Sequence, residues 1–97
     1  MTSPERTEDG RYIVVGGRRW RASDPLIPDE VAAALRSELG RARSRIRTTE
    51  SDEDRCALRD RVQLAKEGLG ERGTPWWEMS AEDRRERAED RLRRLRG

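Results

Sequence analysis

Apolar residues recur at helical spacing in residues 28–47. At 100° per residue, the apolar side chains of this stretch fall within about 80° of arc on one face of a helix. They are Val31, Leu35, Leu39, Ala42 and Ile46. Pro28 suits the first helical position, and the acidic side chains of Asp29 and Glu30 favour the positive end of the helix dipole. The pattern predicts an amphipathic helix over about residues 28–47, in which Gly40 indicates a close helix crossing or a bend.

A second apolar pattern follows the polar segment TTESDED. Its apolar residues repeat at 4-3-4 spacing, which is typical of a helix that packs on another helix. They are Leu58, Val62, Ala65 and Leu69. Ser51, three residues before Asp54, has the spacing of an N-terminal cap, and Gly70 suits the positive φ that often ends a helix. The sequence predicts a helix over about residues 52–69, antiparallel to the first because the connection is short.

Residues 80–97 are dominated by alternating acidic and basic side chains. Ser80 and Asp83 again have the spacing of an N-terminal cap, but the apolar residues that follow are few. They are Ala81, Ala88, Leu92 and Leu95. Oppositely charged side chains four positions apart add only a few tenths of a kcal/mol each. We expect a solvated, mobile C-terminal helix that orders against a partner or a second copy of the chain.

Near the N-terminus the apolar period changes to that of strands. In RYIVVGGRRWRA, two runs of strand-forming residues flank Gly16-Gly17, a pair that supplies the positive φ angles of a type I′ turn. This predicts a β-hairpin over residues 11–22 with Ile13 opposite Trp20. Because an isolated hairpin is marginally stable in water, we expect the Ile13/Trp20 face to pack on the helices. Residues 1–10 show no period and predict a disordered tail.

These elements predict a mainly α protein of the α+β class. An N-terminal β-hairpin packs on an antiparallel helical hairpin, and a charged helix follows at the C-terminus. Residues 11–79 form a single small domain that ends in a loop with two tryptophans over residues 70–79, and residues 80–97 form the charged helix. A chain of 97 residues supports one core. Leu, Ile, Val and Phe together number only fifteen, so we expect a thin core.

Charge and composition narrow the chemistry. The chain has 22 basic and 20 acidic residues, and its net charge of +2 is small for a dedicated binder of polyanions. It has no histidine and a single cysteine, Cys56, so neither a Cys/His zinc site nor a thiol–imidazole catalytic pair can form within one chain. The segment GLGERG has the spacing of a dinucleotide-binding motif, but it ends a helix instead of following a strand. We expect no enzymatic activity, no cofactor and no metal.

Membrane insertion is not expected either. The chain has no run of about 18 apolar residues, and no charged-then-apolar leader precedes the predicted domain. We therefore expect a cytoplasmic protein that does not enter the membrane.

The segment from Asp9 to Glu78 resembles a group of small uncharacterised bacterial proteins. The resemblance rests on two unusual phrases, GRRWRASDP and GERGTPWW. Some members carry an automated label that links them to Tol-like biopolymer transporters, but a Tol membrane component would need a membrane-spanning segment, which this chain lacks. The resemblance implies a recurring small domain, with no activity and no functional residues to transfer.

The first candidate surface for a partner is the loop with two tryptophans. Two adjacent indoles are hard to bury together in a small domain, and tryptophan is enriched at binding hot spots. We group them with nearby apolar residues as candidate partner-binding side chains: Trp76, Trp77, Met79, Leu92 and Leu95. The alternative is that the two indoles close the open end of the helical hairpin and enlarge a core that lacks phenylalanine.

The second candidate surface is the arginine-rich hairpin. Arg18, Arg19 and Arg21 flank Trp20, and arginines beside aromatic rings bind phosphates and stack on bases. The alternative is that they make ordinary cross-strand and cation–π contacts. We expect a non-enzymatic protein-interaction module or adaptor that binds a protein partner or forms a homodimer. A nucleic-acid-binding accessory protein that uses the hairpin is the alternative.

Overall fold

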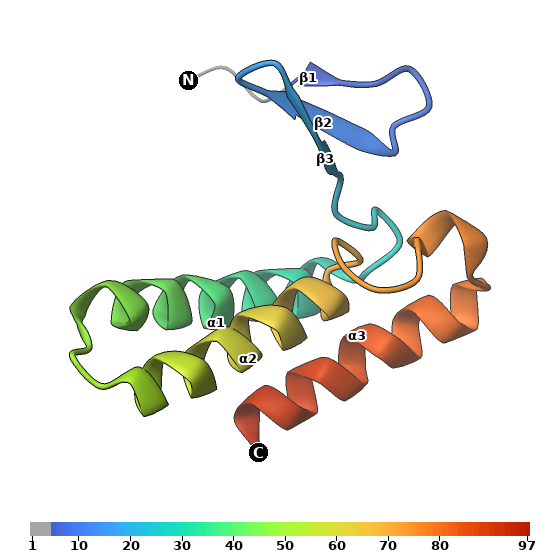
Figure 1. Cartoon of the computed structure of the whole chain (residues 1–97). Coiled ribbons are helices and arrows are strands. Elements are labelled where there is room, and N and C mark those ends of the chain that lie inside the picture. The colour runs from blue at the N-terminus through green and yellow to red at the C-terminus, as the bar shows by residue number, and fades with distance from the viewer. Residues whose placement is uncertain (1–4) are drawn as a thin grey trace.

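The computed structural model describes residues 5–97, in which a three-stranded antiparallel sheet precedes three α-helices (Figure 1). The strands are β1, Glu5–Arg6, β2, Tyr12–Val15, and β3, Arg18–Arg21. The helices are α1, Asp29–Thr48, α2, Asp52–Gly68, and α3, Ala81–Arg96, with a short 3-10 helix, η1, Trp76–Glu78, before α3. The predicted α+β class is confirmed, with its hairpin, its helical pair and its C-terminal helix.

The helix ends lie close to the predicted positions because their capping residues act locally. The hydroxyls of Ser51 and Ser80 each accept a hydrogen bond from the backbone N–H three residues later, at 3.2 and 3.1 Å. After α2, Gly70 adopts a φ of +84°. The N–H groups of Gly70 and Glu71 then donate to carbonyls of the last helical turn, at 3.0 and 2.9 Å, which is the Schellman arrangement.

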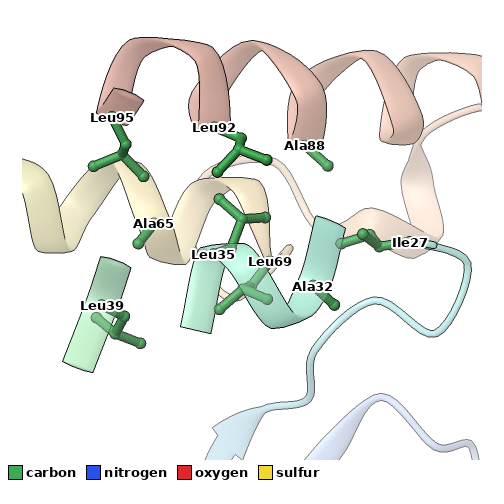
Figure 2. Close-up of a cluster of buried hydrophobic side chains, with 9 residues drawn as sticks. All are labelled: Ile27, Ala32, Leu35, Leu39, Ala65, Leu69, Ala88, Leu92 and Leu95. Atoms are coloured by element: carbon green, nitrogen blue, oxygen red, sulfur yellow. The ribbon is translucent and has the colours of Figure 1, made fainter. Parts of the chain in front are cut away.

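The hydrophobic core lies between the three helices (Figure 2). The predicted apolar faces of the first two helices supply four of its nine residues, and α3 supplies three. The core residues are Ile27, Ala32, Leu35, Leu39, Ala65, Leu69, Ala88, Leu92 and Leu95. Cys56 is exposed.

The packing of α3 corrects the prediction of a solvated, mobile helix. Ala88, Leu92 and Leu95 are buried, and the reason lies in the small residues of α2. A Cβ atom on Gly68 would lie 2.9 Å from Leu35 Cδ2 and 3.1 Å from the Cβ of Arg91. This glycine therefore lets three helices approach closely, and three apolar residues of α3 are enough to join the core.

Gly40 does not mark a close helix crossing, one of the two roles that the sequence allowed. A Cβ atom placed on it would meet no atom within 4 Å, and the residue is exposed in the middle of α1. The predicted close crossing at Gly40 is wrong, and the close approach occurs at Gly68 instead.

The hairpin has the predicted register. Ile13 lies opposite Trp20 and Val15 opposite Arg18, and the two turn glycines have φ values of +58° and +78°. β1 adds a third strand, in which Glu5 and Arg6 pair with β2. The prediction of a disordered tail over residues 1–10 is therefore wrong for residues 5–10, while residues 1–4 lie outside the described part of the chain.

The sheet stands away from the helices (Figure 1). Within residues 5–97 the backbones of the strands scarcely approach those of the three α-helices. The radius of gyration, 14.1 Å, exceeds the roughly 13 Å expected of a compact domain of this length. The expected packing of the Ile13/Trp20 face on the helices is wrong: Trp20 and Val15 are 42% and 49% exposed. The physical reason is that α3 already covers the apolar faces of α1 and α2.

Candidate functional site on the exposed sheet

Trp76, the first of the two adjacent tryptophans, is buried. Its indole Nε1 donates a hydrogen bond of 3.0 Å to the carbonyl oxygen of Ala22, directly after β3. The guanidinium of Arg84, from α3, lies 5.1 Å from its ring centroid. Trp76 thus joins the end of the sheet to the helices and is part of the protein's own core.

Trp77 is half-buried and supports the sheet. Its ring lies edge-on to Trp76, with centroids 5.2 Å apart, and its centroid is 5.5 Å from that of Tyr12. The guanidinium groups of Arg11 and Arg21 lie 5.0 and 5.8 Å from the Trp77 ring, within the range of cation–π attraction. The sheet therefore rests on this indole.

The remaining candidate residues of the first surface lie apart from the indole pair. Leu92 and Leu95 are buried in the core between the helices, and Met79 is half-buried beside a groove along α3. Like Trp76, the two leucines cannot reach a partner unless α3 leaves the core. The structure does not bring the five residues together as one exposed patch.

The two unusual phrases, GRRWRASDP and GERGTPWW, meet in space and form one interface. The Nη1 atom of Arg21 donates to the carbonyl oxygen of Gly73 at 2.8 Å. The hydroxyl of Ser23 donates to the Oε2 atom of Glu71 at 2.7 Å. These polar contacts, with the indoles, fix the sheet relative to the helices.

Asp24, in the same interface, is a buried carboxylate that sequence reasoning missed. It accepts hydrogen bonds from Arg84, through Nε at 2.8 Å and through Nη2, and from the backbone N–H of Leu26 at 2.8 Å. The hydrogen bond from Arg84 to this carboxylate raises the pKa of Arg84. A Cβ on Gly70 would lie 2.9 Å from the Cβ of Asp24, so this position requires glycine for space as well as for its positive φ. No local pattern signals this pair, because its members are 60 residues apart.

The uncovered surface of the molecule is one face of the sheet, which we call the Trp20 face: Ile13, Val15, Arg18 and Trp20. The guanidinium of Arg18 lies 4.7 Å from the centroid of the Trp20 ring. On the opposite face, Arg19 lies 4.4 Å from the Tyr12 ring. The predicted arginine surface is thus divided between two faces, and each exposed arginine is stacked on an aromatic ring.

Positive charge is concentrated in the sheet. Residues 5–22 contain five arginines against three carboxylates, whereas residues 23–97 contain 17 basic and 17 acidic side chains, so the sheet segment accounts for the net charge of +2. The arginine-rich part of α1, residues 41–47, begins twelve residues into the helix, about 18 Å from its start. Acidic residues 50–54 follow it directly. The two basic regions therefore do not form one continuous surface.

A groove of about 500 Å³ lies between the end of α2, the following loop and α3. Three of its charged groups pair with one another: Arg91 contacts Glu67 at 2.8 Å and Asp90 at 2.5 Å. Burial raises the pKa of the Glu67 carboxyl, but hydrogen bonds from Arg91 and Gln63 outweigh this effect and hold the pKa below its usual value. The groove is a junction of ion pairs within the chain.

Comparisons of the chain with protein-family models, with curated proteins and with solved structures find no match. Within residues 5–97, no three His, Cys, Asp or Glu side chains gather in a way that could hold a metal ion. No helix in the described part of the chain is long and apolar enough to cross a membrane. The functional inference therefore rests on the geometry of the sheet.

Proposed function

We propose that the protein is a non-enzymatic protein-interaction module that binds its partner through the Trp20 face. One observation carries the proposal: Trp20 and Val15 are exposed on the same face of the sheet, and no α-helix of the described chain covers that face. Tryptophan and arginine are the residue types most enriched at binding hot spots, and here Arg18 is stacked on Trp20. The helices and the indole pair act as a rigid base for this surface.

The Trp20 face replaces the tryptophan loop as the proposed contact surface because the loop is engaged within the chain. Trp76 is buried, and Trp77 is occupied by Tyr12 and two arginines. The apolar faces of α1 and α2 are covered by α3. These contacts favour a different protein as the partner over a homodimer built on the helical faces.

The proposal is tested by capture of partners from the native lysate with nuclease treatment. Trp20→Ser removes the exposed indole, and Leu26→Ser is a matched control because Leu26 is 40% exposed but lies outside the sheet. We expect one partner that survives nuclease, is lost with Trp20→Ser and is retained with Leu26→Ser. A partner set that is unchanged by Trp20→Ser contradicts the proposal.

Nucleic-acid binding through the hairpin is the second candidate, favoured by the charge of the sheet. Arg18 and Arg19 are exposed there, beside two aromatic rings on which bases can stack. A mobility-shift series between about 50 and 200 mM salt tests it, because each phosphate contact adds to the salt dependence. Absence of binding at the lowest salt eliminates this candidate.

A further inference from the structure

We propose that the outer edge of β3 accepts an extended, acidic peptide segment of the partner as an additional strand. This inference rests on the proposed function and names the chemistry of the partner. β3 lies at the edge of the sheet, since the strand order is β1-β2-β3. An edge strand presents backbone N–H and C=O groups that can pair with another chain.

The register identifies the backbone groups that are free at this edge. In an antiparallel pair, hydrogen-bonded and non-hydrogen-bonded residue pairs alternate. The N–H of Ala22 donates to the carbonyl of Arg11 at 2.8 Å, so Trp20 and Arg18 also face β2, whereas Arg19 and Arg21 turn their backbone groups outward. Within residues 5–97, no backbone hydrogen bond outside the strand ladders reaches Arg19 or Arg21.

The side chains of β3 define the composition of the added strand. Three of its four residues are arginines, and the fourth is Trp20. Opposite charges directly across a strand pair stabilise it, and like charges destabilise it. A second copy of β3 would bring arginines against arginines, so pairing between copies is disfavoured. A segment in which carboxylates alternate with apolar residues would place acids beside Arg19 and Arg21 and apolar groups beside Trp20.

A nucleic acid fits the same edge less well. Phosphate oxygens accept hydrogen bonds but donate none, so they could use the outward N–H groups of β3 and would leave its carbonyls unpaired. The net positive charge is also limited to the sheet segment, and the arginines of residues 41–47 lie far along α1. A peptide strand uses both kinds of backbone group.

The first test uses short fluorescein-labelled peptides and fluorescence anisotropy. A peptide of alternating Glu and Val is the probe. The same peptide with every backbone nitrogen methylated has equal charge but no N–H donor for a strand ladder, and a Lys–Val peptide reverses the charge. We expect binding of the Glu–Val peptide at least about tenfold tighter than of either control, because each control removes several hydrogen bonds or charge pairs. Equal binding of the N-methylated peptide overturns the inference, as does tighter binding of an oligothymidine strand.

The second test addresses the edge itself. Arg19→Pro removes the outward N–H, and Arg19→Ala is the matched control that removes the same side chain and keeps the N–H. We expect Arg19→Pro to bind the Glu–Val peptide about tenfold more weakly than Arg19→Ala. If proline disturbs the sheet, amide hydrogen exchange of the unaltered protein, measured with and without the Glu–Val peptide, gives the answer. We expect the peptide to slow exchange at the backbone amides of Arg19 and Arg21. Exchange that the peptide leaves unchanged overturns the inference.

Failure of this inference is distinguishable from failure of the proposed function. A captured protein partner that depends on Trp20 but binds Arg19→Pro and Arg19→Ala equally leaves the proposed function standing and overturns strand addition. If the unaltered protein captures no partner that survives nuclease, both the proposed function and this inference are contradicted.

Discussion

The buried ion pair between Asp24 and Arg84 is predicted to contribute most among the polar contacts that join the sheet to the helices. The Asp24 side chain is 1% exposed and accepts two hydrogen bonds from the guanidinium. Asp24→Ala leaves that guanidinium beside Trp76 without its counter-charge. Breaking a buried, hydrogen-bonded pair from one side costs about 3–5 kcal/mol, and we expect a loss of this size in the free energy of unfolding.

Urea unfolding followed by circular dichroism measures this loss. The set comprises the unaltered protein, Asp24→Ala, Arg84→Ala and the double variant, because a double-mutant cycle isolates the coupling between contacting residues. We expect the double variant to lose clearly less stability than the sum of the single variants. Asp52→Ala is the matched control: Asp52 contacts Arg55 at 2.6 Å but is 98% exposed, so we expect less than about 1 kcal/mol. A loss at Asp24 as small as that at Asp52, or strictly additive losses, would refute this reasoning.

Three further predictions follow from the packing, and each is measured by urea unfolding of the variant concerned. Gly40→Ala should stabilise the protein by about 0.5–1 kcal/mol because its new methyl group meets open space in a helix. Gly68→Ala should destabilise it by about 1–3 kcal/mol through overpacking. Effects of the same sign would contradict the placement of Gly40 in open space and of Gly68 at the close helix contact. Leu92→Ala should lower the free energy of unfolding by about 2–5 kcal/mol because Leu92 lies in the core. A loss near zero would contradict the packing of α3 in that core. The hydrogen bond from Arg91 helps to keep the pKa of Glu67 below its unfolded value despite burial, so ionised Glu67 stabilises the fold above the unfolded pKa and this contribution is lost as the pH falls through the folded pKa. The free energy of unfolding of Glu67→Gln should therefore fall less steeply with decreasing pH in this range. An unchanged fall would show that other carboxyls cause it.

The elements that could be predicted from the sequence are those fixed by neighbouring residues. Helix periods, the serine caps at Ser51 and Ser80, and the glycine after α2 act over three or four positions. The hairpin register follows from the two-residue Gly16-Gly17 loop, since loop length sets which residues face each other. Each of these features is determined within one element, and each was confirmed.

Contacts between distant elements could not be predicted in the same way. The place of α3 in the core depends on Gly68 in another helix, and a glycine in a sequence does not reveal whether it faces a neighbour or, like Gly40, faces open space. β1 consists of two residues, too few to show an alternating pattern. The interface of Asp24 with Arg84 joins segments whose spacing carries no periodic signal.

The candidate site was predicted in part. The sequence correctly placed Ile13, Val15 and Trp20 on one face of the hairpin, but the marginal stability of isolated hairpins led to the expectation that this face is covered. The hairpin is stabilised in other ways: by pairing with β1, by Trp77 under the opposite face and by the hydrogen bond of Arg21 to Gly73. An exposed face therefore depends on contacts that sequence patterns do not encode.

Two separate sets of contacts stabilise the helices and hold the sheet. The helices are stabilised by apolar burial, while the sheet is positioned by indoles, arginines and backbone carbonyls at one end. Because the sheet takes no part in the helical core, its Trp20 face and its β3 edge are free for a partner without loss of that core. The same arginines that attract an acidic strand repel a second β3, and like charges on an edge strand limit aggregation. A small protein with a thin core can thus expose Trp20 beside an edge strand whose like charges oppose pairing between copies.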